Sequence, residues 1–133
     1  MIRKIPFKLA INVMLVIFTG IILFHILVLA GVIPFAMVWG GRLGSRDEMQ
    51  IFETISIVVN FLIITVVAIK GGYIKSFVPR AVVTVFLWAL VILFSLNTVG
   101  NLLSNSFLEA IIFTPLTLMA AVFCYRLAVE KPR

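Results

Sequence analysis

The amino-acid sequence predicts an all-α polytopic membrane protein whose four transmembrane helices form an up-down-up-down bundle. Hydrophobic residues make up 63% of the chain and charged residues 12%, and the mean hydropathy is +1.26. A soluble domain has about 45–50% apolar and about 25% charged residues, so most of these side chains must face lipid. The apolar segments do not alternate with a period of two residues, which argues against a membrane β-barrel.

Four apolar segments are long enough to cross a bilayer as helices. We expect them at residues 9–33, 46–69, 79–103 and 107–129, within one domain of residues 1–133. The first segment has an apolar run longer than the roughly 7–15 residues of a signal-peptide core, so we interpret it as a retained span.

Three local signals predict where the helices begin. Ser45 and Glu48 have the spacing of a capping box, and Ser106 and Glu109 repeat it, which predicts the starts of the second and fourth helices. Pro79 fits the first turn of the third helix, where its missing N–H costs nothing.

Basic residues are concentrated on one side of the predicted bundle. Nine of the 11 lie there, namely Arg3, Lys4, Lys8, Lys70, Lys75, Arg80, Arg126, Lys131 and Arg133. The positive-inside rule then makes this side, which carries both chain termini, cytoplasmic. The net charge of +6 is explained by these flanking residues, so we expect no nucleic-acid partner.

Polar residues of all four predicted spans reach the outer half of the bilayer. His25 lies 16 residues into the first span, or roughly 24 Å from its cytoplasmic edge, and Asn97 reaches a similar height in the third. The sequence therefore predicts an outer-half polar pocket, with the candidate binding residues His25, Glu53, Asn60, Asn97, Asn101 and Thr114.

Two polar stripes should point into the bundle or toward a partner. Each follows helical spacing, and their members are Glu53, Ser56 and Asn60 on the second helix and Asn97, Asn101 and Asn105 on the third. A charge near the middle of a membrane costs about 2.5–3.5 kcal/mol on insertion scales, so it normally faces protein or a cavity.

Each polar residue also has a purely structural interpretation. Glu53 is near enough to the outer interface to form an ion pair with Arg42 or Arg46, and His25 could be a neutral imidazole hydrogen-bonded to an asparagine or a backbone carbonyl. The asparagines could simply join helices, through bonds that average about 0.6 kcal/mol, and Glu109 has its capping role. In the functional interpretation, His25 and Glu53 bind and release a proton or cation.

No pattern of residues predicts a metal site, a cofactor or a catalytic centre. The chain has one His and one Cys, so a cluster of such ligands at zinc-binding spacing is missing. We interpret Cys124 as a packing residue in an apolar stretch. A membrane-embedded enzyme is therefore the least favoured functional class.

Four short segments carry a resemblance to known sequences. They are WGGRL at residues 39–43, FETIS at 52–56, NTVGN at 97–101 and TPLT at 114–117. Together they resemble a group of functionally uncharacterised small bacterial four-span membrane proteins. The resemblance implies a bacterial inner (plasma) membrane and no particular activity.

Besides the less favoured enzyme, two functions remain open for the bundle. The first is a small transporter or channel subunit that uses the region of Glu53, His25 and Asn97, and works as a homodimer because four helices enclose little space. The second is a non-catalytic membrane subunit, or a module that binds a ligand or a membrane-protein partner. The lipid bilayer is a partner in either case.

Overall fold

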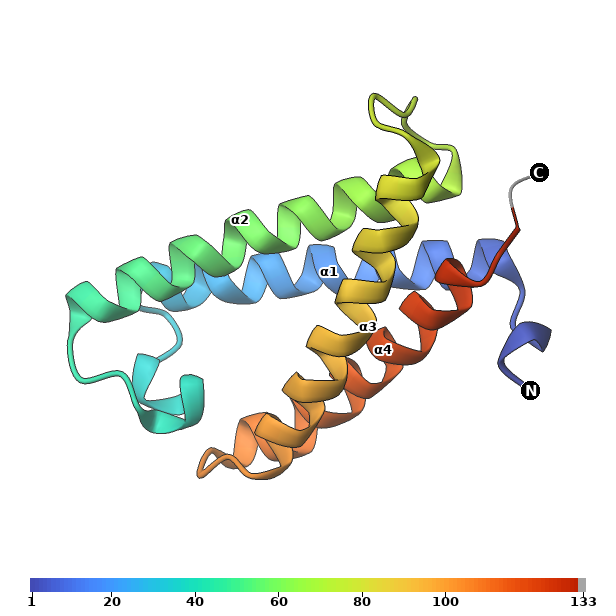
Figure 1. Ribbon diagram of the computed structural model, residues 1–133. Coiled ribbons are helices and arrows are strands. Elements are labelled where there is room, and N and C mark those ends of the chain that lie inside the picture. The colour runs from blue at the N-terminus through green and yellow to red at the C-terminus, as the bar shows by residue number, and fades with distance from the viewer. Residues whose placement is uncertain (132–133) are drawn as a thin grey trace.

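A computed structural model describes residues 1–131, and helix is the only regular secondary structure in that range. The long elements are α1 (Phe7–Leu29), α2 (Arg46–Gly71), α3 (Arg80–Leu102) and α4 (Thr114–Ala128). A π-helical segment, η4 (Glu109–Phe113), leads directly into α4. The segments Phe7–Leu29, Arg46–Gly71, Arg80–Leu102 and Glu109–Ala128 are each long and apolar enough to cross a membrane. The predicted fold class, a four-helix membrane bundle, is confirmed (Figure 1).

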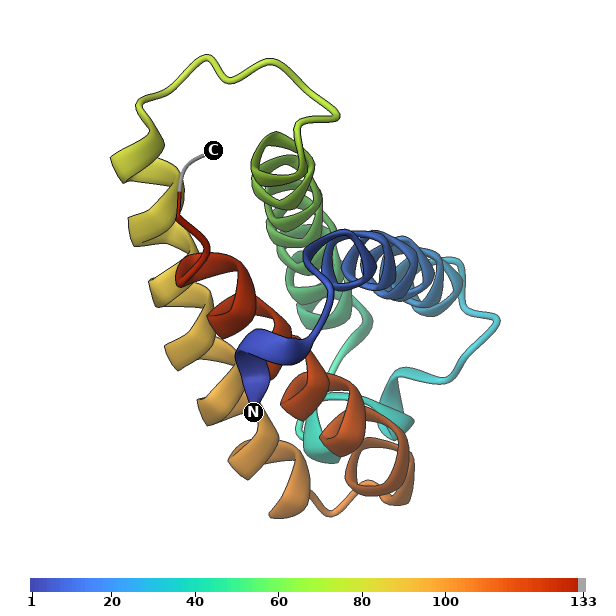
Figure 2. The ribbon, with the colours of Figure 1, turned by 90° about the vertical axis from the view of Figure 1, so that its right-hand side faces the viewer.

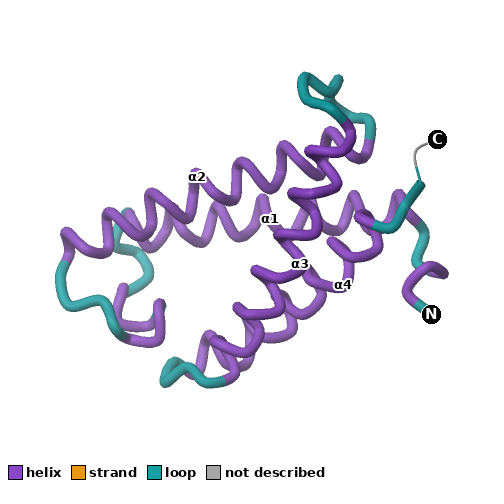
Figure 3. The backbone as a smooth tube through the Cα atoms, viewed as in Figure 1, coloured by secondary structure: helices purple, strands orange, loops and turns teal. Residues whose placement is uncertain are grey.

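The helices are arranged as two antiparallel hairpins. α1 packs mainly against α2, and α3 mainly against α4, whereas α1 touches α4 less and α2 touches α3 only sparsely. The hairpins are inclined to each other, so they are close at one end and spread apart at the other (Figures 1 and 2). The N-terminal segment, the end of α4 and residues 72–79 lie at the closed end, here named the termini end. Residues 30–45, the distal loop, and the α3–α4 connection lie at the other, the distal end (Figure 3).

The apolar core lies in the half of the bundle nearer the termini end. All four long helices contribute to it, through Ala10, Ile11, Met14, Phe18, Ile63, Val66, Val67, Val83, Leu87, Leu90, Phe94, Ala120, Ala121, Cys124, Leu127 and Ala128. A smaller cluster of Val28, Val38 and Met49 lies beneath the distal loop. The hairpins are therefore joined by apolar packing at the termini end and depend on other contacts at the distal end.

The first helix ends four residues earlier than the predicted span of residues 9–33. It runs from Phe7 to Leu29, and Gly31 then adopts a left-handed conformation with φ of 81°. The N–H of Gly31 bonds to the carbonyl of Val28, and that of Val32 to the carbonyl of Leu27, which together form a Schellman motif. Because the residues after Gly31 are still apolar, hydropathy alone extended the span too far. The predicted start of the second span at residue 46 is correct, and the other predicted boundaries lie within two residues of the observed spans when η4 is counted with α4.

The two predicted capping boxes have different outcomes. Ser45 caps α2 as expected, since its hydroxyl accepts a hydrogen bond of 3.2 Å from the N–H of Glu48. The box at Ser106 is wrong, because that hydroxyl donates to the carbonyl of Met37 at 2.6 Å. The carboxylate of Glu109 likewise has no capping role, and accepts bonds from the N–H of Gly40 and the hydroxyl of Ser104. These side chains instead fasten the distal loop to the α3–α4 connection.

Candidate functional site

The distal loop reverses direction through three consecutive residues with positive φ. Trp39, Gly40 and Gly41 have φ values of 54°, 66° and 70°. A left-handed backbone costs a residue with a side chain about 1–2 kcal/mol, so contacts of the Trp39 side chain must offset that cost. Its indole N–H donates to Oε1 of Glu53 at 2.8 Å, and its ring packs edge-on against Phe52 with the centroids 5.0 Å apart.

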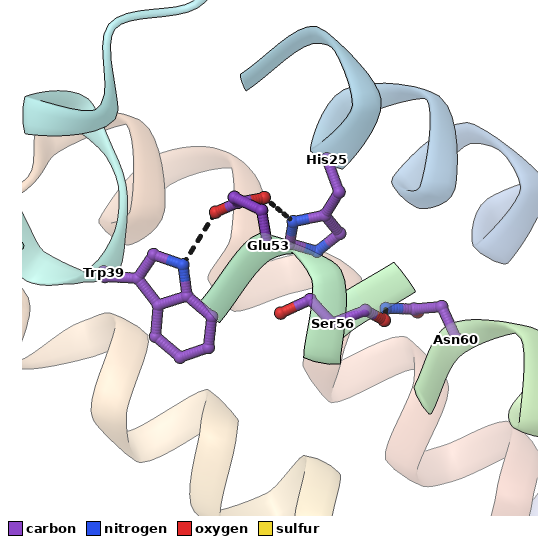
Figure 4. Close-up of polar contacts among 5 residues, drawn as sticks. All are labelled: His25, Trp39, Glu53, Ser56 and Asn60. Carbon is purple, nitrogen blue, oxygen red and sulfur yellow. Dashed lines mark hydrogen bonds and ion pairs between the residues drawn. The ribbon is translucent and has the colours of Figure 1, made fainter. Parts of the chain in front are cut away.

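Glu53 is the centre of a polar cluster formed by α1, α2 and the distal loop (Figure 4). Its side chain is fully buried, and its second oxygen, Oε2, lies 2.5 Å from Nδ1 of His25. With the carboxylate ionised, both contacts are donor-to-acceptor bonds and the imidazole carries a proton on Nδ1. The polar residues of two helices and a loop thus converge on one carboxylate.

The partners of Glu53 differ from the arginines that the sequence suggested. Among residues 1–131, the carboxylate pairs with His25 and Trp39, and neither Arg42 nor Arg46 forms an ion pair. Both arginines are exposed. Glu53 lies on the buried face of α2, so its carboxylate meets α1 rather than the exposed start of its own helix.

The other ring nitrogen of His25 is free to meet a ligand. Nε2 has no hydrogen-bond partner among residues 1–131, and that range contains no buried side-chain nitrogen or oxygen without a partner. Nε2 must therefore be accessible. The His25 side chain is 15% exposed and lines a cleft, whereas Glu53 does not line it. The imidazole therefore contacts the buried carboxylate on one side and the cleft on the other.

This cleft, of about 690 Å³, lies in the distal half of the bundle between the two hairpins. Its walls are largely apolar, with Phe18, Phe24, Phe94 and Phe113 among them. Hydrogen-bonding side chains are contributed by both hairpins and the distal loop, and they are His25, Trp39, Arg42, Ser56, Asn60, Asn97, Asn101, Ser104, Glu109 and Thr117. Such a cleft combines apolar walls with a few polar groups, as small-molecule sites commonly do.

The polar stripe of α2 points inward as the sequence predicted. Glu53, Ser56 and Asn60 are all buried, at 0%, 9% and 8% exposure. The amide nitrogen of Asn60 donates to the carbonyl of Ser56 at 2.7 Å. The amide oxygen of Asn60 makes no hydrogen bond within residues 1–131. It must be accessible, because that range contains no buried side-chain nitrogen or oxygen without a partner.

The predicted asparagine stripe, which was expected to point into the bundle or toward a partner, does not lie in packed interior. Asn97 and Asn105 are exposed and Asn101 is half-buried. The buried face of α3 is set by four apolar residues and ends at Thr98; its members are Val83, Leu87, Leu90, Phe94 and Thr98. The asparagines lie beside this face, so Asn97 and Asn101 line the open cleft instead.

Two threonines that the sequence interpretation passed over join α3 to α4. The hydroxyls of Thr98 and Thr117 lie 3.0 Å apart, and the amide nitrogen of Asn101 donates to Thr117 at 3.4 Å. Thr98 follows Phe94 at helical spacing, and this spacing was the sequence signal that could have placed Thr98 on the buried face of α3.

Thr114, a predicted pocket residue, does not line the cleft, and Thr117 lies there instead. The hydroxyl and backbone N–H of Thr114 both reach the carbonyl of Glu109 across the π-helical segment. Pro115 follows at once, and it lacks the N–H that a regular α-helix would need there. A π turn contains one residue more than an α turn, so the side chains that follow it point in a different direction from those of a continuous α-helix. Thr117 follows this turn and lines the cleft. Turns of this kind are frequent at functional sites.

No protein family, curated protein or solved structure matches the chain. Residues 1–131 contain no group of three or more His, Cys, Asp or Glu side chains placed to hold a metal ion.

Proposed function

We propose that this chain is a small transporter or channel subunit that binds a small polar solute in the cleft and handles a proton or cation through His25 and Glu53. One observation carries the proposal. The accessible Nε2 of His25 lines the cleft, while Nδ1 of the same ring contacts a fully buried carboxylate.

The ring nitrogens give the pair a way to respond to protonation. A proton on Nε2 makes an imidazolium paired with Glu53, whereas its loss leaves the buried carboxylate with two neutral donors, His25 and Trp39. Because an unpaired buried charge is costly, proton occupancy at His25 and the surroundings of Glu53 must be linked. That linkage is what proton-coupled binding requires.

The cleft offers further hydrogen-bonding groups to a solute. The amide oxygen of Asn60 and the whole amide of Asn97 make no hydrogen bond within residues 1–131. These groups are uncharged, so they suit a solute that both donates and accepts hydrogen bonds. Alternating access would require the two hairpins to rock against each other. Because α2 and α3 touch only sparsely, such a movement would have to break mainly the bonds between the distal loop and the α3–α4 connection.

The charge distribution supports an orientation for the membrane-spanning chain. Both termini and the basic flanks would face the cytoplasm, by the positive-inside rule. The resemblance of the four short segments to small bacterial four-span proteins supports a bacterial inner membrane. In that orientation the cleft opens in the outer half of the bilayer.

Asn97 favours a second candidate, a non-catalytic module that binds a membrane partner. Its amide is exposed within a transmembrane helix and has no hydrogen-bond partner in the part of the chain that the structure describes. Amide groups cross-link neighbouring transmembrane helices. A helix from a second copy or from another membrane protein would satisfy this one.

Ion flux into proteoliposomes tests the first candidate. The purified chain is reconstituted, an inward proton gradient is applied, and an entrapped pH-sensitive dye reports proton uptake. We expect uptake above that of empty liposomes, and its loss in Glu53→Gln and His25→Ala. Asp47→Asn, an exposed change near the start of the same helix, is the matched control. Uptake equal in all variants would overturn the transport proposal.

Disulfide cross-linking tests the second candidate. Asn97→Cys is introduced in a Cys124→Ala background, so that the new thiol is the only one. Oxidation to a covalent dimer, absent from a matched Val85→Cys variant on the exposed surface of α3, would place Asn97 at an interface between copies. Equal yields from both positions would count against that interface.

A further inference from the structure

A second cavity, of about 1010 Å³, lies at the termini end of the bundle, away from the cleft. It is bounded by the N-terminal segment, the end of α2, residues 72–76, the start of α3 and the end of α4. Eight of the chain's 11 basic residues line it, against one acidic residue, Glu130. The charge around this cavity is therefore strongly positive.

Two of the basic side chains have structural partners. Arg126 is 7% exposed, and it donates to the carbonyl of Ile5 at 2.8 Å and to the carboxylate of Glu130 at 2.6 Å. Its guanidinium also lies over the ring of Phe7, 5.8 Å from the centroid. The ammonium of Lys70 donates to the backbone carbonyl of Glu130 at 3.2 Å. These contacts hold the N-terminal segment against α4, and the end of α2 against the residues that follow α4, and so build the cavity wall.

The other basic side chains have no partner of this kind. These six side chains form no side-chain hydrogen bond or ion pair within residues 1–131, and they are Arg3, Lys4, Lys8, Lys75, Arg80 and Lys131. They belong to separate parts of the fold, since Arg3 and Lys4 lie in the short helix before α1 and Arg80 begins α3. The fold thus gathers cationic groups around one space without neutralising them.

We propose that this cavity binds a phosphate-bearing anion, and that the headgroup of an anionic phospholipid is the source that its position favours. The cavity lies where four membrane-spanning helices begin or end, which is the depth of lipid headgroups. Basic pockets between transmembrane helices bind such headgroups. Ile5, Phe7 and Ile74 in the lining supply apolar surface for the adjoining acyl chain.

Membrane orientation alone does not require this arrangement. The positive-inside rule needs basic residues close to the ends of the spans, and it is satisfied wherever on the surface they lie. Here they surround a cavity that Arg126 helps to build. Anion binding in this cavity would not depend on any transport through the cleft at the distal end.

Native mass spectrometry of the detergent-purified full chain tests the proposal. Phosphatidylglycerol is titrated against the wild type and against Lys4→Gln/Lys75→Gln/Arg80→Gln, which leaves Arg126 and its contacts unchanged. Arg42→Gln/Arg46→Gln at the distal end is the charge-loss control. We expect the triple variant to bind on the order of tenfold to a hundredfold more weakly, and the control to bind as the wild type does.

Further arms separate the sources of phosphate. Zwitterionic phosphatidylcholine should bind weakly and equally to all three proteins. If soluble glycerol phosphate at millimolar concentration displaces phosphatidylglycerol, the cavity is a phosphate site whose ligand is a soluble anion. If it does not displace the lipid, the lipid headgroup is supported as the ligand. Equal retention of phosphatidylglycerol by the wild type and the triple variant would overturn the proposal, as would equal binding of the two lipids to the wild type.

Discussion

Nδ1 of His25 lies 2.5 Å from Oε2 of Glu53, and this contact joins α1 to α2 in the half of the bundle that the main apolar core does not reach. The same carboxylate accepts the indole N–H of Trp39, so it also holds the distal loop. One fully buried side chain therefore connects three segments. Its removal should affect both the stability of the bundle and the chemistry of the imidazole.

Substitutions of Glu53 should lower the stability of the protein more when they leave more hydrogen-bond donors without an acceptor. Glu53→Ala leaves the donors of His25 and Trp39 without an acceptor and opens a small cavity, so we expect a loss of about 2–3 kcal/mol. Glu53→Gln keeps the volume and an acceptor for Trp39, and should cost about 1 kcal/mol. Unfolding by SDS in mixed micelles, followed by circular dichroism, measures both. Asp47→Ala, exposed on the same helix, should change stability by less than about 0.5 kcal/mol; an equal effect of Glu53→Ala would contradict this prediction.

The position of the proton on the His25 ring should depend on Glu53. In the wild type the carboxylate accepts from Nδ1, so neutral imidazole should be the Nδ1–H tautomer. In Glu53→Gln the amide can present its NH2 group to Nδ1, which then becomes an acceptor and shifts the proton to Nε2. Nitrogen-15 NMR resolves the two tautomers, and the chain's single histidine makes the assignment unambiguous. The same tautomer in both proteins would show that the carboxylate does not orient the ring.

Much of the fold could be predicted because lipid imposes simple rules on a chain this short. Hydropathy located four spans, and Ser45 marked the start of α2 correctly. The inward face of α2 followed from helical spacing together with the cost of exposing Glu53 to lipid. These inferences needed only the residue types within one helix.

The sequence grouped His25 with Glu53, but the contact of Glu53 with Trp39 could not be predicted, because it depends on how separate segments meet. Trp39 reaches the carboxylate only through a left-handed backbone, which the sequence gives little reason to expect at a tryptophan. The face of α3 that turns inward could, in contrast, have been predicted from the sequence. Its buried residues Leu87, Leu90, Phe94 and Thr98 follow helical spacing, and apolar packing rather than the asparagines decided which face turned inward.

Two glycines in helices should respond in opposite ways to replacement by alanine. A Cβ on Gly71 would lie 2.7 Å from Cγ2 of Ile11, which is itself 1% exposed and cannot easily shift, so we expect Gly71→Ala to cost about 1–3 kcal/mol. A Cβ on Gly20 would meet nothing within 4 Å, so Gly20→Ala should be neutral or stabilising by up to about 1 kcal/mol. SDS unfolding compares the two variants. A loss of stability in Gly20→Ala that matched that of Gly71→Ala would show that close packing of α2 on α1 is not the cause.

The attachment of the distal loop should depend on Glu109, whose Oε2 accepts from the N–H of Gly40 at 2.8 Å. A hydrogen bond to a charged group contributes about 1.5–3 kcal/mol, so in Glu109→Ala the Gly40 amide should exchange its hydrogen at least about tenfold faster. Glu48 provides a crossed control, because its Oε2 accepts from the N–H of Gly44 at 2.9 Å. In Glu48→Ala the Gly44 amide should exchange faster, while the Gly40 amide should not change. Hydrogen exchange followed by NMR reads both amides in each variant, and equal rates at Gly40 in the two variants would contradict the prediction. Gly40, Ser104 and Glu109 all line the cleft, so faster exchange at Gly40 would mean that this wall of the cleft opens when the loop is released.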